Sequence, residues 1–425
     1  MASRESDWRR EAENSVLLKA VSHWREEPER WFQGSYDRLP ETVRVNPMSE
    51  EKVWVESWLS GIGANRIPWF SGPGSAWEMP FDRGSAQEEV KSLMAALHET
   101  GRITRQEAVS MLPVLALDPT PGQIVLDLCA SPGSKTTQIC EHLGDSGAVI
   151  ANEVISGRVN TLVTNVHRHA SRAVLVVQHD GRHIPKVPGS GFDGVLVDVP
   201  CTGSGTTRKN PDVWGKWRPS SGRSLHSLQY DLLRRAIAVT KPGGRVVYST
   251  CSLDPIENEA VVSRAVADGN VRVIPCGDSL SGVPSNPGMA NWALLNDRGE
   301  LDVESTFEEY LFPPKDKAVS SQLSDCLRVW NDEIGGGGFF LAVLEKVQGE
   351  DVSRTIDPFP SQKTFDDPES FPRPIDEERE IELREVWGSV PSNMWSRGKS
   401  LLWSSDEIRK IWGADRTRKS GKELI

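Results

Sequence analysis

The feature that most constrains the fold is an alternation of short apolar runs with helix-like stretches between residues 124 and 251. Runs of this kind, separated by helices and punctuated by Gly and Pro, are typical of a mostly parallel sheet covered on both faces. We therefore predict an α/β domain that ends with an antiparallel strand at the sheet edge, in residues 335–346. The runs are IVLDL, AVIAN, AVLVVQHD, GVLVDV and GRVVYST, with helices in SKTTQICEHL, in a polar segment to residue 167 and in residues 225–239.

The rest of the chain divides into smaller units. Its 425 residues leave room for two or three domains, at ~150 residues per domain. Upstream we expect an α+β unit, with strands near TVRVNP and VWVESWL and a helix near residues 88–98. Downstream, a stretch rich in Pro, Asp and Glu is interpreted as an acidic linker, and SLLWSSDEIRKIW regains apolar periodicity. The expected units are residues 1–114, 115–346, 347–385 and 386–425.

Composition excludes two classes of protein. No stretch approaches the ~20 consecutive apolar residues of a membrane helix, and the segment MASRESDWRREAENSVLLKA lacks the apolar core of a secretory signal. The six cysteines contain no C-x-x-C pair and no zinc spacing, so we interpret them as reduced thiols and expect no metal. We therefore expect an intracellular protein.

Charge is distributed unevenly along the chain. The net charge of −11 would argue against a polyanionic partner, but residues 201–250 carry nine Lys or Arg against two Asp, which is +7. Residues 351–385 are net negative instead. The first segment is suited to phosphate groups, and the second to a solvated linker.

A tight loop follows the first strand of the α/β domain, in LDLCASPGSKTT (126–137). A strand, a Pro-Gly turn and a helix N-terminus let backbone N–H groups approach a ligand closely. The loop is neither a P-loop nor G-x-G-x-x-G. With a single glycine it favours an uncharged or cationic ligand over a pyrophosphate, and a purely structural turn is the alternative.

Two carboxylates end the next two strands. Glu153 follows Gly133 by ~20 residues, the position from which an acidic side chain reaches a ribose hydroxyl in nucleotide-binding folds. Asp180 closes the following strand, where a carboxylate would meet an adenine amino group. Together they indicate a nucleoside without phosphates, and helix capping by both acids is the alternative.

Two cysteines and a further carboxylate also stand at strand ends. Asp198 and Cys201 end an apolar strand in LVDVPCTGSGTTRKNPDVW, and Cys251 ends another in VVYSTCSLD. A buried carboxylate without a partner is costly and usually marks a site. The alternatives are a buried filler role for a cysteine and a solvated role for the basic loop around residues 208–209.

This set of groups fits one reaction. Carbon 5 of cytosine is too weak a nucleophile to take a methyl group, unless a thiolate first adds to carbon 6 and turns the ring into an enamine. A carboxylic acid at the N3 and N4 edge would promote the addition, and a second thiol would assist release. S-adenosylmethionine is a nucleoside with a cationic sulfur and no phosphate, so it matches the loop.

The motifs resemble those of the NOL/NOP/Sun family of RNA cytosine-5 methyltransferases, most closely its eukaryotic multisite tRNA branch. The resemblance runs from LPETVRVNP (39–47) to FFLAVLEK (339–346). It includes TGRITRQEAVSMLPVLALD, LDLCASPGSKTTQ, DVPCTGSGTTRKNPDVWGKW and YSTCSLDPIENEAVV. It implies a class I methyltransferase (Rossmann-like) fold with a mostly parallel seven-stranded sheet, an N-terminal α+β domain that helps to hold RNA, and a short C-terminal extension.

The resemblance also implies roles for particular residues. Cys251 matches the nucleophile, Cys201 the thiol needed for product release, and Asp198 and Lys135 the residues that contact the target base. The implied S-adenosylmethionine pocket comprises Cys129, Ala130, Ser131, Pro132, Gly133, Ser134, Lys135, Glu153, Asp180 and Asp198.

Two departures from the family pattern stand out. Ser204 replaces the aspartate usual in the GDGT turn, which we do not expect to abolish activity. In this branch a PUA-like RNA-binding domain follows the catalytic core, and here only SRGKSLLWSSDEIRKIW resembles its first strand and helix. We therefore expect residues 386–425 to be a partial or truncated remnant of that domain.

The expected function is methyl transfer from S-adenosylmethionine to carbon 5 of cytosine in tRNA. Ribosomal or messenger RNA as substrate, and an RNA-binding scaffold without activity, are the alternatives; the missing G-x-G-x-x-G disfavours a nicotinamide dehydrogenase. We expect a monomer that binds RNA, uses no metal and no membrane, and resides in the nucleus, the nucleolus or the cytoplasm.

Overall fold

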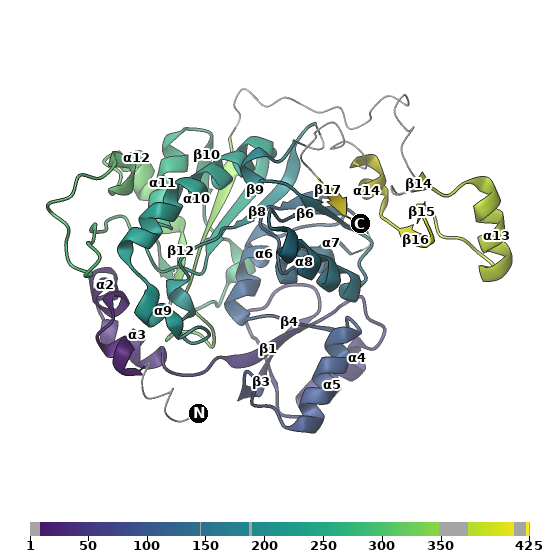
Figure 1. Cartoon of the computed structure of the whole chain (residues 1–425), viewed down its shortest axis with the longest axis horizontal. Helices are drawn as coiled ribbons and strands as arrows, with labels where there is room; N and C mark the ends of the chain where they lie inside the picture. The colour runs from purple at the N-terminus through teal and green to yellow at the C-terminus, as the bar shows by residue number, and fades with distance from the viewer. Residues whose placement is uncertain (1–8, 145, 187–188, 348–372, 412–421, 425) are drawn as a thin grey trace.

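The computed structural model describes residues 9–144, 146–186, 189–347, 373–411 and 422–424. Figure 1 shows a central twisted sheet with helices on both faces, a smaller N-terminal sheet below it and a C-terminal unit at one side. Among the described residues, no helix is both long and apolar enough to span a bilayer.

The core of the central sheet consists of parallel strands in the order β7-β6-β5-β8-β9. The chain builds outward from β5 in one direction and then returns to build from β8 in the other. The boundary between β5 and β8 is therefore a topological switch point, where open α/β sheets bind ligands beyond the strand ends. The strands are β5 (Ile124–Asp127), β6 (Ala148–Asn152), β7 (Val174–Gln178), β8 (Phe192–Asp198) and β9 (Thr240–Thr250).

Antiparallel strands extend this core to a ten-stranded sheet, more than the seven predicted. β13 (Phe339–Lys346) pairs antiparallel with β9, as expected, but it is not an edge strand. Its other side pairs with two strands end to end, because the region near residues 270–330 supplies strands where only an insertion was expected. Nearly every residue of β13 is buried, which is the pattern of an interior strand. The additional strands are β10 (Val271–Ile274), β11 (Asn286–Pro287), β12 (Leu327–Val329) and β17 (Lys422–Leu424).

Helices cover both faces of the sheet, which confirms the predicted α/β class. Leu126 belongs to the core beneath α10 (Pro219–Val239) and α11 (Glu259–Ala267), whereas its neighbour Val125 belongs to the core on the opposite face. Alternate residues of a strand point to opposite faces, so each strand contributes to both cores. The opposite face is covered by α6 (Leu112–Leu117), α7 (Ser134–Leu143) and α8 (Ser156–His169).

The N-terminal region has two parts. The helices α2 (Val16–Trp24) and α3 (Pro28–Gly34) pack beside α9 (Asp212–Lys216) through tryptophans, with the rings of Trp31 and Trp214 5.5 Å apart. The second part is a small sheet in the order β2-β3-β1-β4, with two helices. Its elements are β1 (Pro40–Val45), α4 (Lys52–Gly61), β2 (Asn65–Arg66), β3 (Ser75–Asp82), α5 (Glu88–Glu99) and β4 (Ile103–Arg105).

The predicted strand in VWVESWL is wrong, because this segment forms helix α4. Val55 and Leu59 are both fully buried and stand four residues apart, so they face the small core from one side of a helix. The alternating apolar residues of a short segment fit a strand equally well, and only the tertiary contacts decide between the two. The predicted strand in TVRVNP and the helix near residues 88–98 are confirmed as β1 and α5.

A buried ion pair joins the small sheet to the central domain. Arg44 of β1 donates to both carboxylate oxygens of Glu141 on α7, each at 2.8 Å, and both side chains are almost completely inaccessible. Burial alone would raise the pKa of Glu141, but Arg44 and His169 lower it to about 2. Removing one partner of such a pair leaves an uncompensated buried charge. The pair therefore fixes the small sheet over the switch point.

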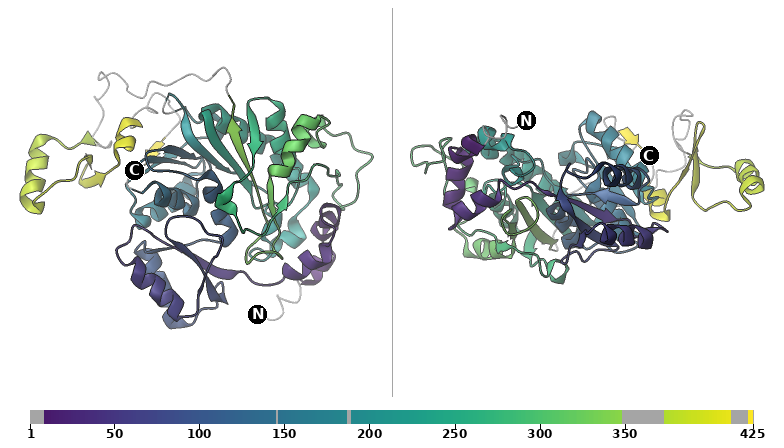
Figure 2. Two further views of the ribbon diagram at one scale, coloured as in Figure 1. Left: turned by 180° about the vertical axis from the view of Figure 1, so that it is seen from behind. Right: turned by 90° about the horizontal axis from the view of Figure 1, so that it is seen from below.

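In Figures 1 and 2, helix α13 (Glu377–Trp387) of the C-terminal unit stands away from the rest of the molecule. The end of the unit packs against the central domain instead, because Ile408 and Ile411 belong to its core and Glu407 accepts from the N–H of Gly147. Residues 348–372, most of the predicted acidic linker, lie outside the described residues. The predicted boundaries at residues 114 and 385 both fall inside helices, α6 and α13. The unit contains β14 (Arg373–Pro374), α13 (Glu377–Trp387), β15 (Met394–Arg397), β16 (Ser400–Trp403) and α14 (Asp406–Ile411).

Short helices complete the fold. One of them, η1, contributes to the site described below, and η3 follows directly after the loop that carries Cys201. The remaining segments are η1 (Ala108–Met111), η2 (Gly181–His183), η3 (Ser204–Thr206), η4 (Asp278–Leu280), η5 (Glu309–Leu311), α12 (Lys317–Ser320) and η6 (Ser321–Asp325).

Candidate active site

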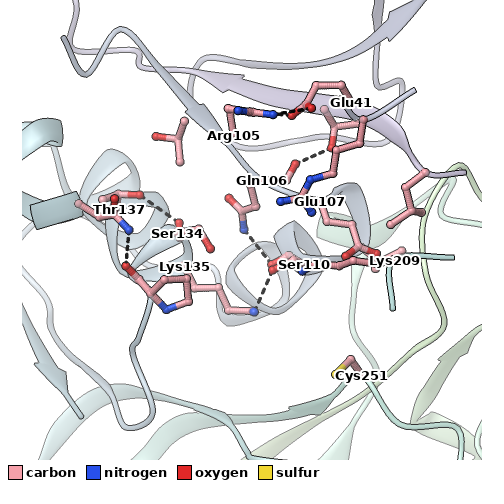
Figure 3. Close-up of a pocket in the computed structure, with 18 of the residues that line it drawn as sticks. Glu41, Arg105, Gln106, Glu107, Ser110, Ser134, Lys135, Thr137, Lys209 and Cys251 are labelled. Carbon is pink, nitrogen blue, oxygen red and sulfur yellow. Dashed lines mark hydrogen bonds and ion pairs between the residues drawn. The ribbon is translucent and has the colours of Figure 1, made fainter. Parts of the chain in front are cut away.

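A cavity of about 370 Å³ opens at the switch point, between the strand ends of the central sheet and the small N-terminal sheet. Figure 3 shows Lys135 and Lys209 on opposite sides of this cavity, with Cys251 below them. Of the predicted site residues, the cavity brings together Pro132, Gly133, Ser134, Lys135, Asp198 and Cys251. We call it the site cavity.

The two predicted thiols lie in contact. The sulfur atoms of Cys201 and Cys251 are 3.2 Å apart, although the residues are fifty positions apart in the chain. The hydrogen bond with Cys251 and burial both raise the pKa of Cys201 well above its ordinary value. Cys201 therefore remains a protonated thiol that can donate to the sulfur of Cys251.

A lysine and a carboxylate stand beside the thiols. The ammonium group of Lys135 donates to Asp198 Oδ2 at 2.7 Å and to Ser110 Oγ at 2.9 Å. The second oxygen of Asp198 accepts from Ser249 Oγ at 2.8 Å. Burial acts to lower the pKa of Lys135, but the attraction of Asp198 prevails and raises it. Lys135 is therefore a cation, with two of its three N–H donors used by residues that the structure describes.

The loop after β5 is fixed by neighbouring elements. Gly133, the N-cap of α7, has a φ of +110°, which L side chains rarely adopt, so the backbone conformation favours glycine there. An added Cβ would also lie 2.9 Å from the side chain of Leu162. The Ala130 N–H donates to Asn152 at the end of β6 (2.8 Å), and α8 holds the carbonyl of Ser131 through Arg158 (2.8 Å). Cys129 is half-buried, and burial raises the pKa of its thiol.

The two acids predicted to hold a nucleoside lie outside the site cavity. Glu153 is buried at the end of β6, where it accepts from the N–H of Ile155 and lies 3.4 Å from Arg158. Asp180 caps η2 and forms an ion pair with Arg182 at 2.6 Å. Capping, the alternative interpretation from sequence, thus describes the contacts of Asp180. Both acids still stand at carboxyl ends of parallel strands, on the β6 and β7 side of the loop.

Asp127 is a residue that the sequence interpretation missed. Asp127 is the last residue of β5, as Asp198 is the last residue of β8. This shared position at a strand end could have identified Asp127 as a candidate site residue. Asp127 is buried and accepts from Thr136 Oγ1 at 2.7 Å, and its other oxygen has no hydrogen-bond partner in the described part of the chain. Burial, opposed by Thr136 and Lys135, raises the pKa of Asp127 to about 7.

This pKa predicts a pH-dependent stability. Between pH ~4 and about 7, folded Asp127 keeps a proton that the unfolded chain has lost, so stability falls as pH rises through this window. Asp127→Asn cannot ionise and should gain stability over the wild type by on the order of 2 kcal/mol between pH 5 and 8. Thermal unfolding across this range measures it. A difference between Asp127→Asn and the wild type that does not change with pH would refute the assignment.

Glu257 organises the two loops that carry the thiols. It is fully buried and accepts from the N–H of Thr202 and from Gln229 Nε2, both at 2.9 Å, and from Ser252 Oγ at 2.5 Å. One carboxylate therefore holds the neighbour of Cys201 and the neighbour of Cys251 together. The sequence offered no signal for this role, because Glu257 stands in a polar stretch without periodicity.

The hydroxyl of Ser204, the serine that departs from the family pattern, has hydrogen-bond partners on the Cys251 side of the site. Ser204 Oγ accepts from the N–H of Leu253 at 2.7 Å and lies 3.0 Å from Ser252 Oγ. The next residue, Gly205, donates its N–H to the carbonyl of Cys251 and accepts from the N–H of Gly338. These bonds join three segments at the thiol pair.

Gly205 leaves no room for a side chain. A Cβ there would lie 2.3 Å from the Gly338 oxygen and 2.9 Å from the Cys251 oxygen. We expect Gly205→Ala to lower the free energy of unfolding by about 1–3 kcal/mol, as overpacking does. Gly157→Ala is the control, because a Cβ at that helical position meets nothing within 4 Å. Denaturant unfolding of both variants measures the effect, and equal stabilities would contradict the prediction.

The basic segment contributes less to the site than its charge suggested. Of its nine basic residues, Lys209 lines the site cavity, and Arg208 and Lys209 line a second, adjoining cavity that is described below. The other seven line neither cavity. Others are engaged elsewhere, for example Lys216 with Asp212 and Arg245 with the carbonyl of Ala116. Within the described ranges, no group of three or more His, Cys, Asp or Glu is arranged to hold a metal ion.

Fold and site together define the class of the protein. A sheet with a switch point between β5 and β8, a loop and helix after β5, and reactive side chains at the strand ends are the features of a Rossmann-like fold. Among solved structures, the methyltransferase homologue from Pyrococcus horikoshii shares this fold, with a TM-score of 0.57 and 29% identity over 77% of this chain and 93% of that one. The class is that of the Rossmann-like methyltransferases.

The chain belongs to the RsmB/F family of methyltransferases, whose model, described as 16S rRNA methyltransferase RsmB/F, matches residues 114–345. The family confirms the resemblance drawn from the motifs. The chain is 36% identical over 315 residues to the multisite-specific tRNA:(cytosine-C(5))-methyltransferase of Saccharomyces cerevisiae, covering 68% of this chain and 46% of that protein. It is 39% identical over 317 residues to the tRNA (cytosine(34)-C(5))-methyltransferase of Drosophila melanogaster, covering 66% and 42%. The chain thus spans less than half the length of these two relatives.

Proposed function

We propose that the protein transfers a methyl group from S-adenosylmethionine to carbon 5 of cytosine in tRNA. The observation that carries the proposal is the pair of contacting thiols together with the Lys135–Asp198 ion pair, because Cys251, Lys135 and Asp198 all line the site cavity. The names of the relatives in yeast and fly support cytosine carbon 5 as the target and tRNA as the substrate.

The residues around the loop after β5 fit S-adenosylmethionine. Glu153 would bind the ribose hydroxyls and Asp180 the adenine amino group, while Val154, 54% exposed beside Glu153, offers an apolar contact to the base. Acids and apolar groups suit a cationic nucleoside without phosphates. When bound, S-adenosylmethionine supplies an electrophilic methyl group on a positively charged sulfur.

Cys251 is the proposed nucleophile. Its thiolate adds to carbon 6 of cytosine, and the electron pair released into the ring makes carbon 5 nucleophilic. Asp198 accepts from the N4 amino group, and the remaining N–H of Lys135 donates to N3, which stabilises the negative charge that the addition places there. The expectation of a carboxylic acid at this edge is thereby revised to a lysine–carboxylate pair that shares the task.

Cys201 is the proposed release group. After methylation, carbon 5 gives its proton to a solvent water, the electron pair of that C–H bond forms the double bond between carbons 5 and 6, and the bond between carbon 6 and Cys251 breaks, so a thiolate departs. A protonated Cys201, whose sulfur lies 3.2 Å from that of Cys251, donates a hydrogen bond to the departing sulfur. The raised pKa of Cys201 keeps this proton available at neutral pH.

The target base has to leave its stack to reach Cys251. Enzymes that act on a base swing the nucleotide out about its backbone at a cost of about a few kcal/mol. The site cavity opens between the strand ends and the small N-terminal sheet, so that sheet forms one wall of the entrance. We propose that the small sheet thereby holds the RNA strand.

The decisive test is methyl incorporation. The protein is incubated with labelled S-adenosylmethionine and a tRNA transcript, the RNA is digested to nucleosides, and 5-methylcytidine is quantified. Label in 5-methylcytidine supports the proposal. No label, with tRNA binding retained, would favour an inactive RNA-binding scaffold instead.

Ribosomal RNA is the second candidate substrate, because the description of the family model names 16S rRNA. Competition between a tRNA transcript and a 16S rRNA fragment in one reaction separates the two. We expect at least tenfold higher kcat/KM on tRNA, which corresponds to about 1.4 kcal/mol of transition-state preference. A preference for the ribosomal fragment would overturn the choice of tRNA.

A further inference from the structure

A second cavity of about 450 Å³ adjoins the site cavity. It is formed by the segment after α3, the turn after β3 and the loop after η3. Three residues, Leu39, Arg83 and Lys209, line both cavities, so the two share one rim. The full lining is Ser35, Tyr36, Arg38, Leu39, Arg83, Thr207, Arg208, Lys209 and Pro211.

The lining of this second cavity is strongly basic. It contains four cations, Arg38, Arg83, Arg208 and Lys209, and no acidic residue. Arg208 donates to backbone carbonyls, among them those of Asp37 (2.9 Å) and Gly336 (2.9 Å). Carbonyl oxygens carry no net charge, so these bonds anchor Arg208 without adding a negative charge to the lining; the carboxylates that attract Arg208, those of Asp37, Glu107, Asp82 and Glu78, lie outside the lining. The cavity therefore favours an anion.

The two cations on the shared rim lack partners. Arg83 and Lys209 are exposed, and neither side chain forms a hydrogen bond or ion pair with any residue in the part of the chain that the structure describes. Other cations that line the site cavity are paired, namely Lys135 with Asp198, Arg105 with Glu41 and Arg168 with Glu99. Two unpaired cations at one rim are thus available to an external anion.

We propose that the shared rim is a binding site for a phosphodiester group of the RNA strand, next to the cytidine that enters the site cavity. The proposal rests on the proposed function and assigns residues to its substrate contact. A flipped nucleotide rotates about its backbone, so its flanking phosphates stay at the entrance while the base moves inward. Arg83, in the turn after β3, and Lys209, in the loop after η3, stand at that entrance and would bind the phosphate from two sides.

The test uses charge removal on the full chain. Arg83→Gln, Lys209→Gln and the double variant are compared with Lys216→Gln, which lies in the same basic segment, pairs with Asp212 and lines neither cavity. The double variant should have a KM for a tRNA transcript that is about tenfold higher than that of the wild type. The slope of log K against log[salt], where K is the association constant for tRNA, should become less negative by about 0.7 per lost contact. The kcat, the affinity for S-adenosylmethionine and the unfolding temperature should stay at the wild-type values, and Lys216→Gln should change none of these.

A substrate modification tests the same contact from the RNA side. In the modified transcript, the phosphodiester on one side of the target cytidine is replaced by an uncharged methylphosphonate. The KM of the wild type for this RNA should rise by the same factor as the KM of the double variant rises for the unmodified RNA. The KM of the double variant should be the same for the modified and the unmodified RNA. The phosphate assignment is overturned if the wild-type KM is unchanged both by a methylphosphonate on the 5′ side of the cytidine and by one on the 3′ side.

The outcomes separate this proposal from the proposed function. If the wild type methylates tRNA and the double variant matches it in KM and salt slope, the rim site is wrong and the function stands. If the wild type transfers no methyl group, the function is wrong, and the salt slope of tRNA binding still tests the rim. A reduced slope in the double variant would then support the site, and an unchanged slope would refute it.

Discussion

Replacing Cys251 by alanine is expected to lower kcat for methyl transfer by on the order of 10⁴-fold or more, as removal of a nucleophile does in other enzymes. Alanine has no sulfur to add to carbon 6 of cytosine, so carbon 5 stays unreactive. The side chain lines the site cavity, where truncation removes one atom from a half-buried position. The affinities for tRNA and S-adenosylmethionine should therefore change little.

The measurement is single-turnover methyl incorporation into a tRNA transcript, with enzyme in excess. Cys276→Ala is the matched control, because Cys276 is also a half-buried free cysteine but lines neither cavity. It should retain full activity. A Cys251→Ala enzyme that works within tenfold of the wild-type rate would show that another group attacks the base.

The second large effect is expected from Cys201→Ala, which should trap the reaction after methyl transfer. Without the thiol 3.2 Å from the Cys251 sulfur, the departing thiolate loses its hydrogen-bond donor. Breakdown of the adduct should slow by about 10²–10⁴-fold, the range that general acid catalysis supplies. Protein covalently bound to RNA should then accumulate and appear as a slower band on a denaturing gel.

Two controls make this result specific. The band should require S-adenosylmethionine, and it should vanish in the double variant Cys201→Ala/Cys251→Ala, since that chain lacks the proposed attacking sulfur. A band that persists in the double variant would place the bond on a different residue. Absence of any adduct in Cys201→Ala, with multiple turnover intact, would remove the release role from Cys201.

Several features of the fold follow from local sequence alone. The apolar runs of the central strands predict buried parallel strands, and the helices after them are found close to the predicted ranges, although α10 begins earlier, at Pro219. Pro is favoured in the first helical turn, so this start was readable from the sequence. The strand ends could also be predicted from the sequence, because each apolar run stops at a polar residue. Asp198, Cys201 and Cys251 were therefore expected at one edge of the sheet.

Other features depended on contacts between distant segments. The strand predicted in VWVESWL is the helix α4, because Val55 and Leu59 pack into the small core together. The predicted edge strand β13 lies inside the sheet, because residues from 271–274 and 327–329 pair along it. A short apolar pattern does not specify its neighbours, so neither outcome was determined locally.

The electrostatics of the site were the least predictable part. Glu257 joins the two thiol-bearing loops through Ser252, which is close in the chain, and through Thr202, which is 55 residues away. The pKa of Asp127 depends first on burial, which the sequence does not state. Sequence identified acids as candidates from their position after a strand. It did not say that Asp180 would pair with Arg182, nor that Arg83 and Lys209 would line one rim from distant segments of the chain.

The sequence by itself determined the α/β class, the family and the pair of cysteines, because apolar runs, strand ends and contiguous motifs are local properties of the chain. The tertiary structure alone decided which sulfur touches which, which carboxylate is neutralised by Lys135, and which cations meet at the rim between the two cavities. Distances and dielectric environment arise only when remote segments pack together, and they set the strength of every charge interaction in the site.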